Sequence, residues 1–193
     1  MFVDPKGAWT SIKSKEQSFQ GVLVAHTAIF ALIPAVAGYY GTTVVGWQVG
    51  GGAVTRLAPG SALQICVLYY LAMIVVVASV GGMIRWMSQT YGADQPLGHC
   101  IALATYTATP LFLVGLMQAY PVLWLNLVVG LPALGYTIFL FYTGVPIIME
   151  IPPERAFLFS SAVLAFGLVA FVAMLAVTVL LWGSGIAPAF VQG

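Results

Sequence analysis

Five long apolar stretches, separated by short polar ones, run through the chain. Each is about 20 residues or longer, and a helix of that length spans about 30 Å at about 1.5 Å per residue, which matches the hydrocarbon core of a bilayer. The pattern predicts an all-α integral membrane protein, a bundle of five transmembrane helices forming one domain over residues 1–193. The expected spans are residues 21–40, 62–86, 97–118, 121–142 and 156–182.

The first 20 residues are the longest polar stretch and have a different pattern. Asp4 and Pro5 are typical of a helix N-cap and first helical residue. Apolar residues then recur at helical spacing, while lysines and small polar residues occupy the other faces. We expect an N-terminal amphipathic helix in the headgroup layer, the alternative being a disordered tail. Its expected apolar face comprises Ala8, Trp9, Ile12 and Phe19.

A proline-rich and charged segment, Tyr142–Arg155, separates the last two apolar stretches. Its prolines lack a backbone donor and fix φ, which predicts that no straight helix passes through it. We therefore expect a turn at the membrane surface. Glu150, Glu154 and Arg155 in this turn are candidate partner-binding residues, or they are simply solvated; Glu154 also suits a helix N-terminus.

The cationic residues are distributed unequally between the two expected sides of the membrane. One side holds Lys6, Lys13, Lys15, Arg85 and Arg155, and the other holds Arg56. This bias predicts a cytoplasmic N-terminus and a C-terminus on the outer side. The tryptophans fall near expected interfaces, where an amphipathic ring is favoured. They are Trp9, Trp47, Trp86, Trp124 and Trp182.

Three of the expected spans contain an interior proline, namely Pro34, Pro110 and Pro132 in the first, third and fourth. Each proline frees a carbonyl that must find another partner in lipid. Because the third span carries hydroxyl groups beside its proline, we expect these three spans to face one another with the third in the centre. The interior could bind a ligand, or the small residues could simply permit close packing. The candidate binding residues are Thr105, Tyr106, Thr107 and Thr109.

The two histidines, His26 and His99, are the candidates for proton or metal chemistry. A proton relay needs a carboxylate within the membrane, and no Asp or Glu occurs at depth. His99 precedes Cys100, but no second ligand pair has metal spacing, so we expect no metal site and no cofactor. We expect His99 to make an interfacial hydrogen bond near Asp94 and Glu150, and we keep it as a candidate binding residue.

Composition supports the membrane assignment and excludes several functions. Of 193 residues, 61% are hydrophobic and 6% are charged, against about 25% charged in soluble domains. A net charge of +1 gives no electrostatic reason to expect a nucleic-acid partner. The sequence contains no nucleophile elbow, phosphate loop or dinucleotide fingerprint, so we do not expect an enzyme.

Several short motifs together resemble the Yip family of Ypt/Rab-interacting membrane proteins, in its bacterial branch. They are Asp4-Pro5 with Trp9, Ile12 and Glu16; Tyr106-Thr107-Ala108-Thr109-Pro110; Gly135-Tyr136; Tyr142-Thr143-Gly144-Val145-Pro146; and Pro153-Glu154-Arg155-Ala156. The resemblance implies five spans, a cytoplasmic N-terminus and a bacterial inner membrane. Eukaryotic members resemble adaptors for small GTPases, but their long N-terminal region has no counterpart here, so we do not extend that role to this chain.

Two functions follow as expectations. The first is a non-enzymatic membrane adaptor or organising protein, whose partners would be membrane lipids, other membrane proteins or further copies of itself. The second is a small transporter or channel, which would need to oligomerise because five spans enclose little volume.

Overall fold

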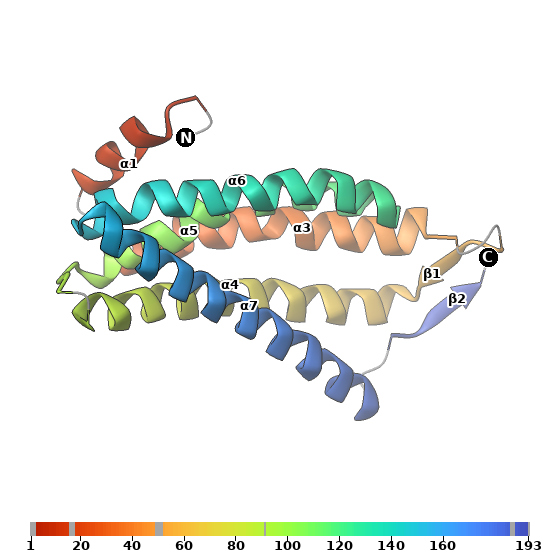
Figure 1. Ribbon diagram of the computed structural model, residues 1–193. Coiled ribbons are helices and arrows are strands. Elements are labelled where there is room, and N and C mark those ends of the chain that lie inside the picture. The colour runs from red at the N-terminus through yellow and green to blue at the C-terminus, as the bar shows by residue number, and fades with distance from the viewer. Residues whose placement is uncertain (1–2, 16–17, 49–51, 91, 186–187, 193) are drawn as a thin grey trace.

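The five expected membrane helices are present in the structure. A computed structural model describes residues 3–15, 18–48, 52–90, 92–185 and 188–192. Within these residues, five helical stretches are long and apolar enough to cross a membrane (Figure 1). They are Phe19–Val45, Pro59–Thr90, Leu97–Ala119, Leu123–Met149 and Pro153–Gly183. The prediction of an all-α five-span bundle is confirmed.

The first span changes helix type along its length. It comprises α2 (Phe19–Val22), the π-helical η1 (Leu23–Ala28), α3 (Ile29–Tyr40) and the π-helical η2 (Gly41–Val45). The span expected over residues 21–40 therefore extends five residues further, to Val45. The hydroxyl groups of Thr42 and Thr43 satisfy carbonyls of the preceding turn, each in a bond of 2.7 Å, so the helix continues. It ends at Gly46, whose φ of 75° requires glycine.

The remaining spans are more regular. They are α4 (Pro59–Thr90), α5 (Leu97–Val114) with its 3₁₀ extension η3 (Gly115–Ala119), α6 (Leu123–Met149) and α7 (Pro153–Gly183). In Figure 1, α7 crosses the bundle obliquely and its C-terminal half lies away from the other helices. It contacts α6 and α4, and most of its apolar residues after Gly167 are exposed, as expected of side chains that face lipid.

Helix α6 continues through a segment that the sequence pattern assigned to a turn. Pro146 lies inside the helix, which ends at Met149. A proline removes one helical hydrogen bond, but in a membrane bundle neighbouring groups compensate for it, so the helix is not obliged to stop. The turn is therefore limited to Glu150, Ile151 and Pro152, and Glu150 adopts the left-handed conformation with φ 56°.

Helix α5 lies at the centre of the packing. It contacts α3 and α6, as expected, but it also packs extensively against α4, which has no interior proline and which the sequence argument left out. Two glycines allow the backbones to approach closely. A methyl group at Gly81 of α4 would lie 2.3 Å from Ile101 Cδ1, and one at Gly115 would lie 2.5 Å from Pro34 Cβ. Small residues thus bring both neighbouring spans against α5.

The N-terminal amphipathic helix is confirmed as α1 (Pro5–Lys13), with the Asp4 side chain accepting a hydrogen bond from the Gly7 N–H at 2.9 Å. Its apolar face, however, packs on the protein. Helix α1 lies against α6, and Trp9 is fully buried between them, so its ring does not face the headgroup layer. Gly144 of α6 has no side chain at this point, and the indole ring occupies the space.

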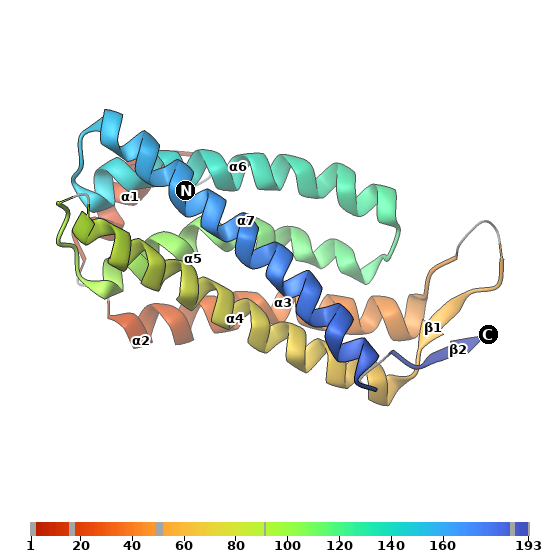
Figure 2. The ribbon, with the colours of Figure 1, turned by 60° about the horizontal axis from the view of Figure 1, so that its bottom comes forward.

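The opposite end of the molecule carries a small sheet that the sequence pattern did not predict. Strand β1 (Thr55–Leu57) pairs antiparallel with β2 (Phe190–Gln192), with Arg56 opposite Val191. The chain termini lie at opposite ends of the bundle, as Figures 1 and 2 show. Five is an odd number of membrane crossings, so the two termini must lie on opposite sides of the membrane.

Candidate functional site

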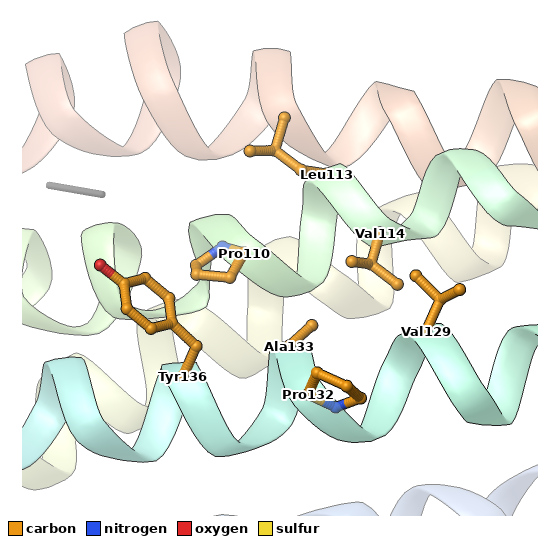
Figure 3. A pocket seen from close by; sticks show the side chains of 7 residues that line it. All are labelled: Pro110, Leu113, Val114, Val129, Pro132, Ala133 and Tyr136. Atoms are coloured by element: carbon orange, nitrogen blue, oxygen red, sulfur yellow. The ribbon is translucent and has the colours of Figure 1, made fainter. Parts of the chain in front are cut away.

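A lateral groove lies between α5 and α6, where each helix contains a proline. Its volume is about 400 Å³. In Figure 3, the ring of Tyr136 points from α6 toward Pro110 on α5, and Val114 and Val129 face each other further along. The lining residues are Pro110, Leu113, Val114, Val129, Pro132, Ala133 and Tyr136. They are predominantly apolar, so the groove can accommodate hydrocarbon.

The groove lies within the membrane-crossing part of both helices. Pro110 is well inside Leu97–Ala119, and Pro132 is well inside Leu123–Met149. Each proline leaves a carbonyl of the preceding turn, at Tyr106 and Val128, without its usual helical donor. Each helix therefore lacks one backbone hydrogen bond beside the groove.

A polar cluster lies on another side of α5, toward the first span. His26 Nε2 lies 3.0 Å from Thr109 Oγ1. The Thr109 hydroxyl donates to the carbonyl of Thr105 at 3.2 Å, so its oxygen accepts from the imidazole N–H. The hydroxyl groups of Thr27 and Thr105 lie 2.8 Å apart, and both residues are fully buried. The cluster joins η1 to α5 within the membrane.

The π-helical geometry of η1 explains how two adjacent residues reach the same helix. Side chains of adjacent α-helical residues point about 100° apart. His26 and Thr27 are adjacent, yet both form hydrogen bonds to α5, His26 to Thr109 and Thr27 to Thr105 one turn earlier. A π-turn is wider and rotates less per residue, which brings the two side chains toward one neighbour. The imidazole also stacks on Phe30 at a centroid distance of 4.3 Å and meets the edge of Tyr106 at 4.6 Å.

Charged groups gather at the end of the bundle that carries α1. Lys13 pairs with Glu150, and Gln95 Nε2 donates to Glu150 Oε2 at 3.2 Å. Arg85 pairs with Asp94 at 2.7 Å and also donates to the carbonyl of Gln95 at 2.8 Å. The hydrogen bond from Lys13 and its positive charge lower the pKa of Glu150 below its ordinary value. This network connects α1, α4 and α6 through the segment before α5.

His99 also makes a hydrogen bond at this end of the molecule. Its Nε2 lies 3.2 Å from the backbone carbonyl of Lys13, to which it donates. The expected hydrogen bond of His99 is thus present at this end, and the carboxylates of Glu150 and Asp94 pair with Lys13 and Arg85. His99 therefore helps to hold the C-terminal end of α1.

The candidate residues from the sequence fall into two groups. Thr105, Tyr106 and Thr109 take part in the polar cluster with His26, while Thr107 is buried with no hydrogen-bond partner among the described residues. His99, Glu150, Glu154 and Arg155 lie at the charged end; Glu154 and Arg155 are exposed, and neither has an ion pair within the described ranges. The assignment of these residues to binding remains a prediction.

Several residues at these sites carry no signal in the sequence that marks them as functional. The residues around Thr27 form no motif that marks it as part of a site. Its hydrogen bond to Thr105 exists because η1 faces α5 in the folded protein. Pro132 is visible in the sequence as a helix-breaking residue, but the sequence does not predict that it lines the same groove as Pro110. The contact between Trp9 and Gly144 could be predicted only if the packing of α1 on α6 were already known.

No metal site is apparent in the part of the chain that the structure describes: no three His, Cys, Asp or Glu residues there are grouped to hold an ion. The two cysteines in this part, Cys66 and Cys100, are free.

Comparison with known proteins gives a consistent family assignment. The chain matches the Yip1 domain over residues 1–174. It is 38% identical over 185 residues to the inner membrane protein YohC of Escherichia coli K12, and the alignment covers 96% of this chain and 95% of the relative. The protein of the same name from a second E. coli strain, CFT073, gives the same values. No solved structure gives a significant match. The chain is therefore an integral membrane protein that belongs to the Yip1 domain family.

Proposed function

We propose that this protein is a non-enzymatic membrane adaptor of a bacterial inner membrane, which holds a lipid chain in the α5–α6 groove and presents its charged end to a protein partner. The membrane location follows the similarity to a bacterial inner membrane protein. The charged end is the side that the positive-inside rule assigns to the cytoplasm, since it carries Lys6, Lys13, Lys15, Arg85 and Arg155. A partner at this end would accordingly be cytoplasmic or have a cytoplasmic segment.

The groove carries the proposal. Its volume of about 400 Å³ falls in the range of small-molecule sites, about 300–1,000 Å³. It opens sideways from the bundle at the level of the hydrocarbon core, where lipid chains are the most abundant molecules. Six of its seven lining residues, all except Tyr136, have no polar side-chain atom. An acyl or isoprenoid chain therefore matches both the chemistry and the location of the groove.

Photo-cross-linking in native membranes tests this proposal. A benzoylphenylalanine placed at Val129, which lines the groove, should form adducts with lipid that mass spectrometry identifies. The same residue placed at Leu131, which is 65% exposed on the same helix, is the matched control and should label the surrounding lipids in proportion to their abundance. The same distribution of lipid adducts at the two positions, or a protein adduct at Val129, would contradict the lipid assignment.

A small transporter is the second candidate, and the polar cluster favours it. His26, Thr27, Thr105 and Thr109 place hydrogen-bonding groups inside the membrane, and such groups commonly mark substrate or ion pathways. Flux of protons or small solutes into vesicles containing the purified protein, abolished in His26→Ala, would support this function. Absence of flux in vesicles with verified protein insertion would remove it.

A further inference from the structure

We propose that the α5–α6 groove binds a neutral membrane lipid through a carbonyl group, which accepts hydrogen bonds from the hydroxyl groups of Thr107 and Thr137. This inference rests on the proposed lipid-binding function and deepens it by naming the chemistry of the lipid's polar group. Isoprenoid quinones and diacylglycerols share this chemistry, because both carry carbonyl groups on an uncharged head beside a long apolar chain.

Thr107 and Thr137 are buried residues whose hydroxyl groups have no partner in the part of the chain that the structure describes. Thr107 is 6% exposed and Thr137 is 8% exposed. Neither hydroxyl bonds the carbonyl four residues earlier in its own helix, which is the partner that Thr109 uses. A buried hydroxyl without a partner costs free energy, so a ligand that bonds these two groups gains more than hydrophobic contact alone provides.

Both hydroxyl groups lie on the helix faces that line the groove, one turn beyond its lining residues. Thr107 is three residues before Pro110 on α5, and Thr137 is four residues after Ala133 on α6. Residues at these spacings share one face of a helix. The two threonines therefore extend the apolar groove of Figure 3 by a polar end, on the side nearer to α1.

The contacts between α5 and α6 place the two threonines at similar levels along the helix pair. A methyl group at Gly144 of α6 would lie 2.8 Å from Leu103 Cδ1 of α5, so these two residues face each other. On each helix, the threonine falls between this contact and the groove-lining residues. Because antiparallel helices advance by the same rise per residue, Thr107 and Thr137 stand across from each other at the end of the groove.

The depth of this site in the membrane limits the kind of polar group that can bind. Thr107 lies about 15 Å along α5 from its start at Leu97, close to the centre of a hydrocarbon core about 30 Å thick. No Asp, Glu, Lys or Arg occurs from residue 97 to residue 149, so α5 and α6 offer no such partner for a charged head group. Since an unpaired charge at this depth is costly, the bound group is neutral.

A carbonyl is the neutral group that matches two hydroxyl donors. Each threonine hydroxyl has one hydrogen to donate, and a carbonyl oxygen has two lone pairs, so a single carbonyl can accept from both residues. Phospholipids also contain ester carbonyls, but their charged head groups hold these at the membrane surface. The apolar chain of a neutral lipid would fill the part of the groove between Val114 and Val129.

Binding of defined lipids to the purified full-length protein in mild detergent tests the proposal, with native mass spectrometry as the readout. The probes are a short-chain isoprenoid quinone, didecanoylglycerol, and a control that carries the isoprenoid chain on a benzene ring without oxygen atoms. At least one carbonyl lipid should bind about ten-fold more tightly than the control, as expected for two hydrogen bonds. The lipid with the higher affinity identifies the source of the carbonyl.

Variants that remove one hydroxyl test the assigned contacts. Thr107→Val and Thr137→Val should each weaken binding of the carbonyl lipid about two- to ten-fold, without changing binding of the oxygen-free control. Ser160→Ala is the matched control and should bind normally. The Ser160 hydroxyl is also buried without a partner among the described residues, but it belongs to α7, which does not line the groove.

Thermal unfolding of the lipid-free variants separates lost binding from lost folding. Both valine variants remove a buried hydroxyl that has no partner in the described chain, so neither should lower the midpoint. A lowered midpoint would show that the hydroxyl has a partner within the protein and would overturn the assignment. The assignment also fails if the oxygen-free control binds as tightly as both carbonyl lipids, or if both valine variants bind the carbonyl lipid normally.

These failures are distinguishable from failure of the proposed function. Lipid adducts at Val129 together with equal binding of all three probes would leave the lipid-binding groove in place and contradict the carbonyl assignment alone. Absence of lipid adducts at Val129 would contradict the proposed function itself.

Discussion

The imidazole of His26 and the hydroxyl group of Thr109 are joined by a hydrogen bond of 3.0 Å, although 83 positions separate them in the chain. The bond connects the π-helical part of the first span to α5, one turn from the pair formed by Thr27 and Thr105. Both bonds lie in membrane-spanning segments, where water does not compete for these groups in the folded protein. They fix the rotation of the first span against the central helix.

We predict that Thr109→Val lowers the free energy of unfolding by about 0.6 kcal/mol, and by no more than about 1.7 kcal/mol, the range measured for hydrogen bonds between membrane helices. SDS-induced unfolding in mixed micelles measures this change. Thr178→Val is the matched control, because the Thr178 hydroxyl bonds only the carbonyl of Met174 in its own helix. A double-mutant cycle with His26→Phe should show coupling, since either single change removes the same bond.

Two adjacent glycines of α4 provide a sharper test of the packing around α5. We predict that Gly81→Ala destabilises the protein by about 1–3 kcal/mol, because the added methyl group would lie 3.0 Å from the Ile101 backbone and closer still to its side chain. Gly82→Ala should be neutral or stabilising by up to about 1 kcal/mol, because the added methyl group would have no neighbour within 4 Å beyond the adjoining backbone of its own helix, and alanine favours the helix. Equal effects in thermal unfolding would show that α4 is rotated differently.

The features that depend on membrane thickness and local helix chemistry could be predicted from the sequence. The five apolar stretches were long enough to span hydrocarbon, and the structure contains a helix at each of them. Asp4 and Pro5 marked the start of α1, where the Asp4 carboxylate caps the helix. Such features need no knowledge of which helix neighbours which.

The features that depend on contacts between distant residues could not be predicted. The π-helical geometry of η1 accompanies hydrogen bonds to Thr105 and Thr109, some 80 positions away. The tryptophan of α1 suits a membrane interface and a protein cavity equally well, and only the presence of Gly144 on the facing helix decides between them. Strands β1 and β2 are three residues each, too short to show an alternating pattern.

The orientation of the bundle leads to a labelling prediction. In single-cysteine variants lacking Cys66 and Cys100, a cysteine at exposed Lys6 should react with a membrane-impermeant maleimide only after the cells are opened. A cysteine at Val191, which is 50% exposed at the opposite end, should react in cells whose outer membrane is permeabilised. This difference follows from the bias of lysine and arginine toward the α1 end. Labelling of both positions from the same side would contradict five crossings.

The ion pair between Lys13 and Glu150 predicts a pH dependence of α1 docking. The hydrogen bond and charge of Lys13 lower the pKa of Glu150 in the folded protein, so the pair stabilises the docked state fully above the ordinary pKa of 4.5. That contribution is lost as the pH falls through the lowered pKa. With 5-fluorotryptophan at position 9, the fluorine resonance should shift toward its exposed position on acidification.

Glu150→Gln is the control for that titration. The substituted protein has no carboxylate at this position, so the resonance of Trp9 should respond less to pH over the same acidic range. The shift should also appear in the unaltered protein at neutral pH when salt is raised, because the pair is exposed to solvent. A Trp9 resonance that responds to pH identically in both proteins would assign the effect to another carboxylate.

Filling the groove between α5 and α6 should displace the lipid that we propose binds there. Ala133 lines the groove and is 8% exposed, so Ala133→Phe places a ring in the space that a chain would occupy. We predict at least a ten-fold loss of co-purified lipid, measured by native mass spectrometry from mild detergent. Leu131→Phe, on the exposed side of the same helix, should retain it. If Ala133→Phe is folded and binds as much lipid as the unaltered protein, the lipid occupies another surface and the groove has a structural role, as a gap left where two proline-containing helices pack.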